Sequence, residues 1–426
     1  MPRTIQQESD TTSQQHKPAR AIVALAGVVM QLLLGTVYGW SVFKKPLMAA
    51  HGWSGTEVGM AFTLAILFIG LSAAFGGRLV DRTGSRNVAR TAAVLFGVGT
   101  ILAGVADAVD SRWLLWIGYG VIGGIGNGLG YITPIAVLVR WFPDKKGLIT
   151  GLAVMGFGLG AAIMGQVAPI LIPRVGVATT FYVFGTIFLI GLLLAAQKLV
   201  NPTEEISIAS AQSQSGKPAA ATSVDFAAAR GMYQFYVLWG ILFINVTAGI
   251  ALISNLSPMA QAQVKLTALA AGTLIFVSSL FNGLGRVCWA CLSDRIGRKT
   301  TFLLILGTQI PVFLLLTHVS TPLLFGILCC YILFCYGGGF ATMPAFAVDT
   351  FGPKNIGSIY GPILLAWGVA GVVGPLLMET VNKASGSFAM ALVVAAVLLA
   401  VGFVLAITYR KPSEQSSPAL ADAYAE

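Results

Sequence analysis

The sequence predicts an all-helical membrane protein with twelve transmembrane helices in two pseudo-symmetric six-helix bundles. Hydrophobic residues make up 56% of the 426 residues and charged residues only 10%, whereas a soluble domain carries about 25% charged residues. The apolar residues are grouped into long runs, and one long polar segment separates the first six runs from the last six. Similar short motifs recur in the two halves, which indicates a duplicated unit.

Each apolar run is long enough to cross the hydrocarbon core of a bilayer, which takes roughly 20 residues of helix. Backbone groups in lipid must be hydrogen-bonded within their own segment, so the spans are predicted to be helices rather than open sheet. The first six predicted spans are 21–43, 55–77, 88–109, 113–139, 147–171 and 177–198. The second six are 232–256, 267–292, 300–318, 322–348, 356–379 and 388–409.

The net charge of +10 follows the predicted topology. With the N-terminus in the cytoplasm, 19 of the 26 Lys and Arg residues fall on the cytoplasmic side, 6 fall outside, and Arg286 lies in a span. This bias is the positive-inside signature of a multi-pass protein, here with both termini in the cytoplasm. We therefore expect a protein of the cell membrane with no nucleic-acid partner. We expect no cleavable signal peptide, because the polar first 20 residues precede an apolar run long enough to span.

A linker and internal repeats divide the chain into domains. The Ser/Ala/Gln-rich region 201–230 is predicted to be a cytoplasmic linker between bundles 21–200 and 231–410, with cytoplasmic tails 1–20 and 411–426. The loop Asp81–Arg86 (DRTGSR) between spans two and three has a counterpart in Asp294–Lys299 (DRIGRK) between spans eight and nine. Parallel repeats of six spans place a substrate site between the halves, near the middle of the membrane.

The doubled loop motif resembles the inter-helix signature of the major facilitator superfamily, and the resemblance extends over essentially the whole chain. More narrowly, Gly35–Phe43 (GTVYGWSVF) and Asn282–Arg286 (NGLGR) resemble the oxalate:formate antiporter family, a relative of the proton-linked monocarboxylate transporters. The resemblance implies the major facilitator fold and transport of a small organic anion. We expect no enzymatic activity, because no motif offers a nucleophile, metal ligands or paired acids in a span; we expect no cofactor and no metal.

The charges of the two loops are predicted to form a conformational latch. Asp81 can accept hydrogen bonds from helix N-terminal amides or pair with a nearby arginine, and Gly84 permits a tight turn. A cytoplasmic cluster that breaks and reforms during transport would hold one conformation. The alternative is a solvated turn whose charges only anchor the topology. The candidate latch residues are Asp81, Arg82, Arg86, Asp294, Arg295 and Arg298.

Arg286 is the first candidate for a substrate ligand. It lies in the apolar stretch Leu274–Ala290, and no acidic residue lies within seven positions of it. A guanidinium stays protonated in proteins, so inside a membrane it needs a negative partner, and its fork matches a carboxylate with two parallel hydrogen bonds. In the alternative interpretation, the side chain reaches toward the cytoplasmic interface, about 9 Å away at helical rise.

Other polar and aromatic side chains are predicted to line the same cavity. Asn282 lies one turn before Arg286, where its amide can orient the guanidinium or a bound carboxylate. Interhelical packing or hydrogen bonding is the alternative for each of these residues. The resemblance implies that the following residues of spans one, four, five and ten line the central cavity: Tyr38, Asn127, Tyr131, Met155, Tyr336 and Phe340.

Trp367 marks a departure from the resembling family. There a lysine is expected near this point of span eleven, so that two cations hold a dianion, but the stretch Tyr360–Gly368 contains no cation. One buried positive charge balances one negative charge, and a second negative charge would stay uncompensated in low dielectric. We therefore expect a monocarboxylate such as lactate, pyruvate, formate or acetate, with Trp367 narrowing the cavity. Simple helix packing is the alternative role of Trp367.

The sequence does not decide which ion, if any, is coupled to transport. Animal-type monocarboxylate transporters carry an aspartate one turn before the span-eight arginine, and Asn282 at that place cannot titrate. The acids Glu57, Asp107, Asp349 and Glu379 are expected at helix ends, so no carboxylate is expected within a span. Proton-linked symport requires the proton to travel on or with the substrate, whereas anion exchange needs no titratable residue.

These observations predict a monomeric secondary transporter of small monocarboxylates that works by alternating access. Its expected partners are the carboxylate substrate, the lipid bilayer and, for symport, protons. An oxalate:formate-type or other organic-anion antiporter is the alternative within this class. A membrane nutrient sensor that binds without transporting is the alternative from another class.

Overall fold

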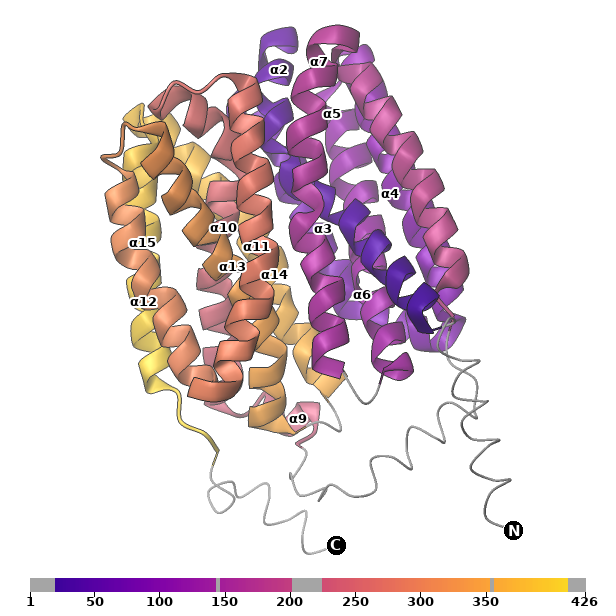
Figure 1. Cartoon of the computed structure of the whole chain (residues 1–426), viewed down its shortest axis with the longest axis vertical. Helices are drawn as coiled ribbons and strands as arrows, with labels where there is room; N and C mark the ends of the chain where they lie inside the picture. Colours follow the sequence, from indigo (N-terminus) through magenta and orange to yellow (C-terminus); the bar gives the residue numbers. More distant parts are fainter. Residues whose placement is uncertain (1–19, 143–145, 201–223, 353–355, 413–426) are drawn as a thin grey trace, which may run out of the picture.

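The computed structural model describes residues 20–142, 146–200, 224–352 and 356–412, and all regular structure in these ranges is helical. In Figure 1 the helices stand nearly side by side, and the two sequence halves occupy opposite sides of the molecule. α2 lies at one end of the assembly and α9 at the other.

The helices of the first half follow an initial helix over residues 20–34. They are η1 (Gly35–Gly39), α2 (Ser41–His51), α3 (Gly55–Thr83), α4 (Ser85–Ala108), α5 (Arg112–Leu115), η2 (Trp116–Gly123), α6 (Gly124–Trp141) and α7 (Lys146–Lys198). Those of the second half are α9 (Phe226–Ala229), α10 (Tyr233–Gln263), α11 (Ala268–Ile296), α12 (Arg298–Leu316), α13 (Pro322–Phe351), α14 (Ile356–Ser385) and α15 (Phe388–Thr408).

Eleven helices in the described part of the chain are long and apolar enough to cross a membrane. One of them, over residues 151–198, is 48 residues long and corresponds to two predicted spans. It is interrupted at Gly176, whose φ of 84° and ψ of 170° are not helical. A left-handed φ is accessible to glycine at little cost, so the chain turns there between spans five and six.

The first span differs from the continuous helix over 21–43 that the sequence predicts. The α-helix ends at residue 34, tightens into the 3₁₀ turn η1, and resumes as α2, which extends to His51. Two glycines, Gly35 and Gly39, flank this turn, and both are in close contact with α7. A short 3₁₀ segment within a longer helix changes the direction of the side chains that follow it. Here it sets the position of Tyr38.

The predicted loop repeat appears as two turns of the same geometry. Gly84 between α3 and α4 has φ 85° and ψ 145°, and Gly297 between α11 and α12 has φ 85° and ψ 153°. Each glycine ends one long helix and directly precedes the next, so the positive φ is a requirement of the turn. α3 begins with a capping box in which Ser54 and Glu57 exchange hydrogen bonds.

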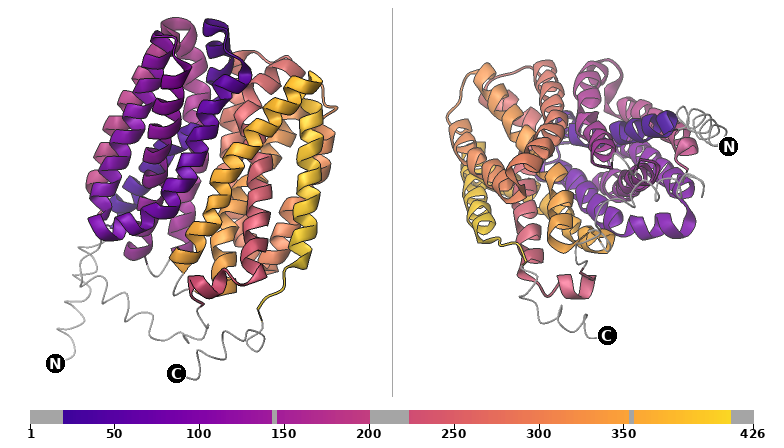
Figure 2. Two further views of the ribbon diagram at one scale, coloured as in Figure 1. Left: turned by 180° about the vertical axis from the view of Figure 1, so that it is seen from behind. Right: turned by 60° about the horizontal axis from the view of Figure 1, so that its bottom comes forward.

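The two halves meet along two helix pairs, α7 with α11 and α3 with α14. Glycines allow these pairs to approach closely. A Cβ atom on Gly272 of α11 would lie 2.1 Å from the carbonyl oxygen of Gly165 of α7, and one on Gly70 of α3 would lie 2.6 Å from the Cα of Gly368 of α14. Small residues at crossings are typical of membrane helices. Figure 2 shows the halves packed side by side in both views.

The contact between α3 and α14 gives a test of this packing. Gly70→Ala places a methyl group against backbone atoms of Gly368, which can move only if a helix shifts, so we expect a loss of about 1–3 kcal/mol of stability. Gly77→Ala in the same helix is the matched control, because a Cβ there meets nothing within 4 Å. Thermal unfolding of the purified variants in detergent measures both. Equal shifts for the two variants would contradict the close packing of the halves.

Candidate functional site

Arg286 lies in the interior of the protein, on the face of α11 that meets the first half. Its side chain is 1% exposed. α11 continues to Ile296, so the Cα of Arg286 lies about 15 Å along the helix from its end. The buried guanidinium faces α7 inside the protein and not the outer surface of the helices. Among the described residues Arg286 forms no ion pair, and its Nε and Nη1 atoms have no hydrogen-bond partner.

Aromatic rings surround the guanidinium. The Cζ of Arg286 lies 5.5 Å from the centre of the Phe340 ring, a distance that allows cation–π attraction. Trp367 contacts Phe340 and Tyr131 edge-on, with ring centres 5.2 Å apart in each pair. The charge of Arg286 also acts electrostatically on the hydroxyl groups of Tyr38, Tyr131 and Tyr336. The structure thus brings together the aromatic residues that the sequence assigned to one cavity.

A hydrogen bond between two tyrosines joins the halves beside this site. The hydroxyl groups of Tyr38 on η1 and Tyr336 on α13 lie 2.6 Å apart, and both side chains are buried. Their rings also meet edge-on, with centres 5.8 Å apart. Because one residue comes from each half, any separation of the halves at this level must break the contact.

Asn282 and Asn127 occupy different environments. Asn282 is 1% exposed, lies one turn from Arg286, and its Oδ1 atom has no hydrogen-bond partner among the described residues. Asn127 is fully buried and donates from Nδ2 to the carbonyl oxygen of Leu34, 2.8 Å away. Leu34 is the last helical residue before η1, so Asn127 stabilises the turn that carries Tyr38. The Oδ1 atom of Asn127, like that of Asn282, has no hydrogen-bond partner among the described residues.

Met155 lies at the contact between α7 and α11 and not among the rings. Its Cγ atom would be 3.3 Å from a Cβ on Gly283, the residue after Asn282. Gly158, on the same helix as Met155, leaves room for Arg286, because a Cβ there would lie 3.1 Å from the guanidinium Nε. Met155 is therefore a packing neighbour of the helix that carries Arg286.

The sequence reasoning missed Phe157, which is central to the ring cluster. This fully buried ring contacts Tyr131, Tyr38 and Trp367 with centres 5.1, 5.3 and 5.9 Å away. The available signal was a single bulky residue between two glycines, Gly156 and Gly158. That pattern occurs in many membrane helices and does not by itself indicate a site.

The loop charges form contacts within the second half in this conformation. Arg298 binds Asp294 at 2.6 Å and Asp349 of α13 at 3.1 Å, and it also donates to Ser293. Arg82, Arg86 and Arg295 are exposed, and the side chain of Asp81 lies outside the described residues. No cross-half contact of this loop cluster occurs among the described side chains, so the latch stays a prediction.

The expectation that Glu379 lies at a helix end is wrong. α14 extends to Ser385, and the Glu379 side chain is only 14% exposed, paired with Lys44 of α2. The two residues are 335 positions apart in the sequence, so no local pattern predicts their pairing. At the same end of the molecule, His51 contacts Asp107 and Asp110 at 2.7 and 2.9 Å. Within the described ranges, no cluster of three His, Cys, Asp or Glu residues forms a metal site.

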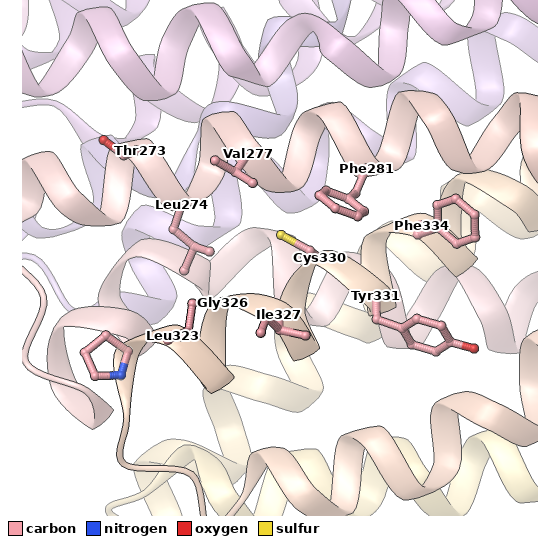
Figure 3. Close-up of a pocket in the computed structure, with 11 residues that line it drawn as sticks. Thr273, Leu274, Val277, Phe281, Leu323, Gly326, Ile327, Cys330, Tyr331 and Phe334 are labelled. Carbon is pink, nitrogen blue, oxygen red and sulfur yellow. The ribbon is translucent and has the colours of Figure 1, made fainter.

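A second hollow lies between α11 and α13, away from the ring cluster, and has a volume of about 500 Å³. Figure 3 shows its lining, which is mainly apolar and includes Leu274, Phe281, Ile327 and Phe334. Phe281 and Ile327 are 41% and 55% exposed, so this hollow opens on the outer surface of the helices. With no charged residue in its lining, it does not offer a site for an anion.

The chain matches the model of the Major Facilitator Superfamily over residues 21–361 and again over 238–423. It is 26% identical over 368 residues to the uncharacterized MFS-type transporter YhjX of Escherichia coli, covering 85% of this chain and 88% of the relative. It is 28% identical over 359 residues to the oxalate:formate antiporter of Oxalobacter formigenes, covering 83% and 82%.

Similarity extends to a eukaryotic relative and to a solved structure. The apicoplast pyruvate carrier 1 of Toxoplasma gondii is 23% identical over 456 aligned positions, covering 83% of this chain and 82% of the carrier. The crystal structure of a bacterial homologue of the human lysosomal transporter Spinster superposes with a TM-score of 0.71 at 14% identity, covering 94% and 99% of the two chains. At that identity the likeness concerns the fold alone.

The tyrosine contact between the halves can be measured with a double-mutant cycle. Tyr38→Phe or Tyr336→Phe alone leaves the other buried hydroxyl without its partner, which costs about 1–3 kcal/mol. The double variant leaves no unpaired hydroxyl, so its loss of stability should be smaller than the sum by about 1 kcal/mol. Thermal unfolding of the four proteins measures the coupling. Strict additivity would show that the hydroxyl groups do not interact.

Proposed function

The chain belongs to the Major Facilitator Superfamily, and we propose that it carries small monocarboxylates across the cell membrane by alternating access. Its relatives are membrane transporters, and two of them are named for oxalate and formate and for pyruvate. Both names describe small carboxylates, which supports this substrate class. The excess of Lys and Arg on one side supports cytoplasmic termini and, with them, an α2 end that faces outward.

The observation that carries the proposal is the buried and unpaired guanidinium of Arg286. Two of its nitrogen atoms lack a partner among the described residues, although the side chain is almost fully buried. Burying a charged group without a partner costs roughly several kcal/mol of free energy. A bound carboxylate would supply both the opposite charge and the missing acceptors. The substrate thus completes a site that the protein leaves electrostatically incomplete.

The surroundings of Arg286 favour one negative charge on the substrate. Trp367 is fully buried and packs against Phe340 and Tyr131. A dianion would need a second cation at this position, and Trp367 provides an uncharged ring instead. The rings offer apolar contact to a short aliphatic body. A dicarboxylate would leave its second carboxylate against these rings, uncompensated.

The mode of coupling follows from the titratable groups near the site. The Cζ of Arg286 lies 5.5 Å from the Phe340 ring, and among the described residues no carboxylate pairs with Arg286. Exchange of one carboxylate for another requires no proton carrier in the protein. The relative named as an antiporter favours exchange over symport. Proton-linked uptake is the second mode, with the proton carried on or with the substrate.

We propose a monomer as the working unit.

Removing the charge of Arg286 is the direct test. Arg286→Gln should lower carboxylate uptake into proteoliposomes by at least about 30-fold, because truncating one partner of a buried charge pair costs about 2–5 kcal/mol. Arg174→Gln, at an exposed arginine of α7, is the matched control and should transport normally. Size-exclusion chromatography shows whether each variant is folded. Uptake at the parent rate by folded Arg286→Gln would end the proposal.

The charge balance of the site predicts substrate preference. In competition with labelled lactate, pyruvate and unlabelled lactate should inhibit uptake more strongly than oxalate. Trp367→Lys adds a cation and should raise the inhibition by oxalate relative to lactate, whereas the neutral control Trp367→Met should not. A parent protein that prefers oxalate, or equal effects of the two variants, would contradict the charge-matching argument.

A further inference from the structure

A second buried cation lies on the contact between the halves, toward the α2 end. The ammonium group of Lys44 on α2 is hydrogen-bonded to Asn255 of α10 and paired with Glu379 of α14. The Lys44 side chain is only 5% exposed and that of Glu379 14%. Lys44 comes from the first half of the chain and both of its partners from the second, so the pair exists only while the halves are closed at this end.

The surroundings of this pair are polar and incompletely bonded. A small pocket is lined by Lys44, Glu379, Asn255 and Thr63 of α3, among others. Thr63 is 2% exposed, and its hydroxyl oxygen has no hydrogen-bond partner among the described residues. The pocket therefore holds an ammonium group, an amide and a free hydroxyl, a set of groups that can bind a carboxylate.

Residues of α10 extend from this pocket to the neighbourhood of Arg286. Successive residues of α10 line it and a second small pocket, with Ser254 and Asn255 in the first and Ile253 and Leu256 in the second. The second pocket also contains Tyr38 and Asn282, which adjoin the Arg286 site. Lys44 lies farther along the same helical segment than Tyr38, toward the α2 end. The two cations therefore follow one another along the contact between the halves.

We propose that Lys44 and Thr63, both on the first half, form a second carboxylate site at the outer end of the substrate path, which Glu379 occupies beside Asn255 while the outer side is closed. The Glu379 carboxylate then stands where the carboxylate of an incoming substrate binds. When the halves separate, Glu379 withdraws with the second half and Lys44 stays on the first. A small carboxylate from outside takes its place and is guided inward to Arg286.

Electrostatics explains why the Lys44–Glu379 pair can hold the outer side closed and Lys44 can also bind a substrate carboxylate. A buried ammonium group without a partner is costly, so the outer side closes only with an anion on Lys44. Glu379 supplies that anion when no substrate is present. Exchange of one carboxylate for another keeps Lys44 neutralised at each stage. This inference rests on the proposed function for the identity of the ligand, but the closure itself can be measured without any substrate.

The first experiment measures closure by labelling. Ser254→Cys, in the full-length protein with its five native cysteines replaced by alanine, is treated in proteoliposomes with a membrane-impermeant maleimide from outside. We expect slow labelling with Lys44 and Glu379 intact, and labelling about tenfold faster with Glu379→Gln, which corresponds to about 1.4 kcal/mol. Lys45→Met is the matched control, because Lys45 is adjacent in sequence but exposed, and should label slowly. Equal rates in Glu379→Gln and its parent overturn the closure.

The second experiment tests the site itself. In the Glu379→Gln protein that also carries Arg286→Gln, external lactate should still slow the labelling, because Lys44 binds it. In Lys44→Met/Glu379→Gln with Arg286→Gln, lactate should give no protection. That variant contains neither charge of the pair, so it leaves no lone buried ion to unfold the protein. The proposed outer site is rejected if adding Arg286→Gln to the Glu379→Gln protein abolishes the protection from labelling by lactate. It is also rejected if lactate still protects the variant that lacks Lys44.

Uptake kinetics then separate a ligand site from a purely structural ion pair. Lys44→Met should raise the external KM for lactate about tenfold, whereas Glu379→Gln should lower it, because a competing carboxylate is removed. A structural ion pair predicts shifts of KM in the same direction, and that result rejects the proposal. If the parent protein transports no carboxylate but Glu379→Gln still labels faster, the proposed function fails and the closure stands.

Discussion

The structure depends on how two positive charges are accommodated inside a low-dielectric interior. Arginine cannot lose its proton, and burial of an unpaired ion is costly, so each buried cation restricts what surrounds it. Lys44 is neutralised by Glu379 from the other half of the chain. Arg286 is equally buried, yet two of its nitrogen atoms have no partner among the described residues. This contrast separates a buried charge that the protein itself neutralises from one for which the proposed function supplies a ligand.

The close approach of the halves makes that contrast possible. Glycines at the α7–α11 and α3–α14 contacts bring backbones into direct contact, and the rings of Tyr131, Phe157 and Trp367 fill the space that remains. The guanidinium is thereby shielded from water, which strengthens any interaction with a carboxylate. As a consequence, a ligand can reach Arg286 only when the halves separate. This packing is consistent with the alternating access proposed for the chain.

Three contacts join the two halves: the rings around Arg286, the hydroxyl pair of Tyr38 and Tyr336, and the ion pair of Lys44 and Glu379. A ligand that binds differently to the open and closed states can shift the equilibrium between them. Under the proposed function, these contacts are the ones that substrate binding would change.

The class of protein, most of the helical segments and the isolated position of Arg286 in an apolar helix could be predicted from the sequence alone. These features are local, because a run of apolar residues, a repeated motif and an isolated cation can each be recognised in a short stretch of sequence. Its aromatic candidates also lie around Arg286, since helical spacing predicts which residues share a face. Only the tertiary structure decided that Phe157 joins them, that Asn127 supports η1, and that Lys44 meets Glu379. Those contacts depend on how helices from distant parts of the chain pack against one another, and no local pattern carries that information.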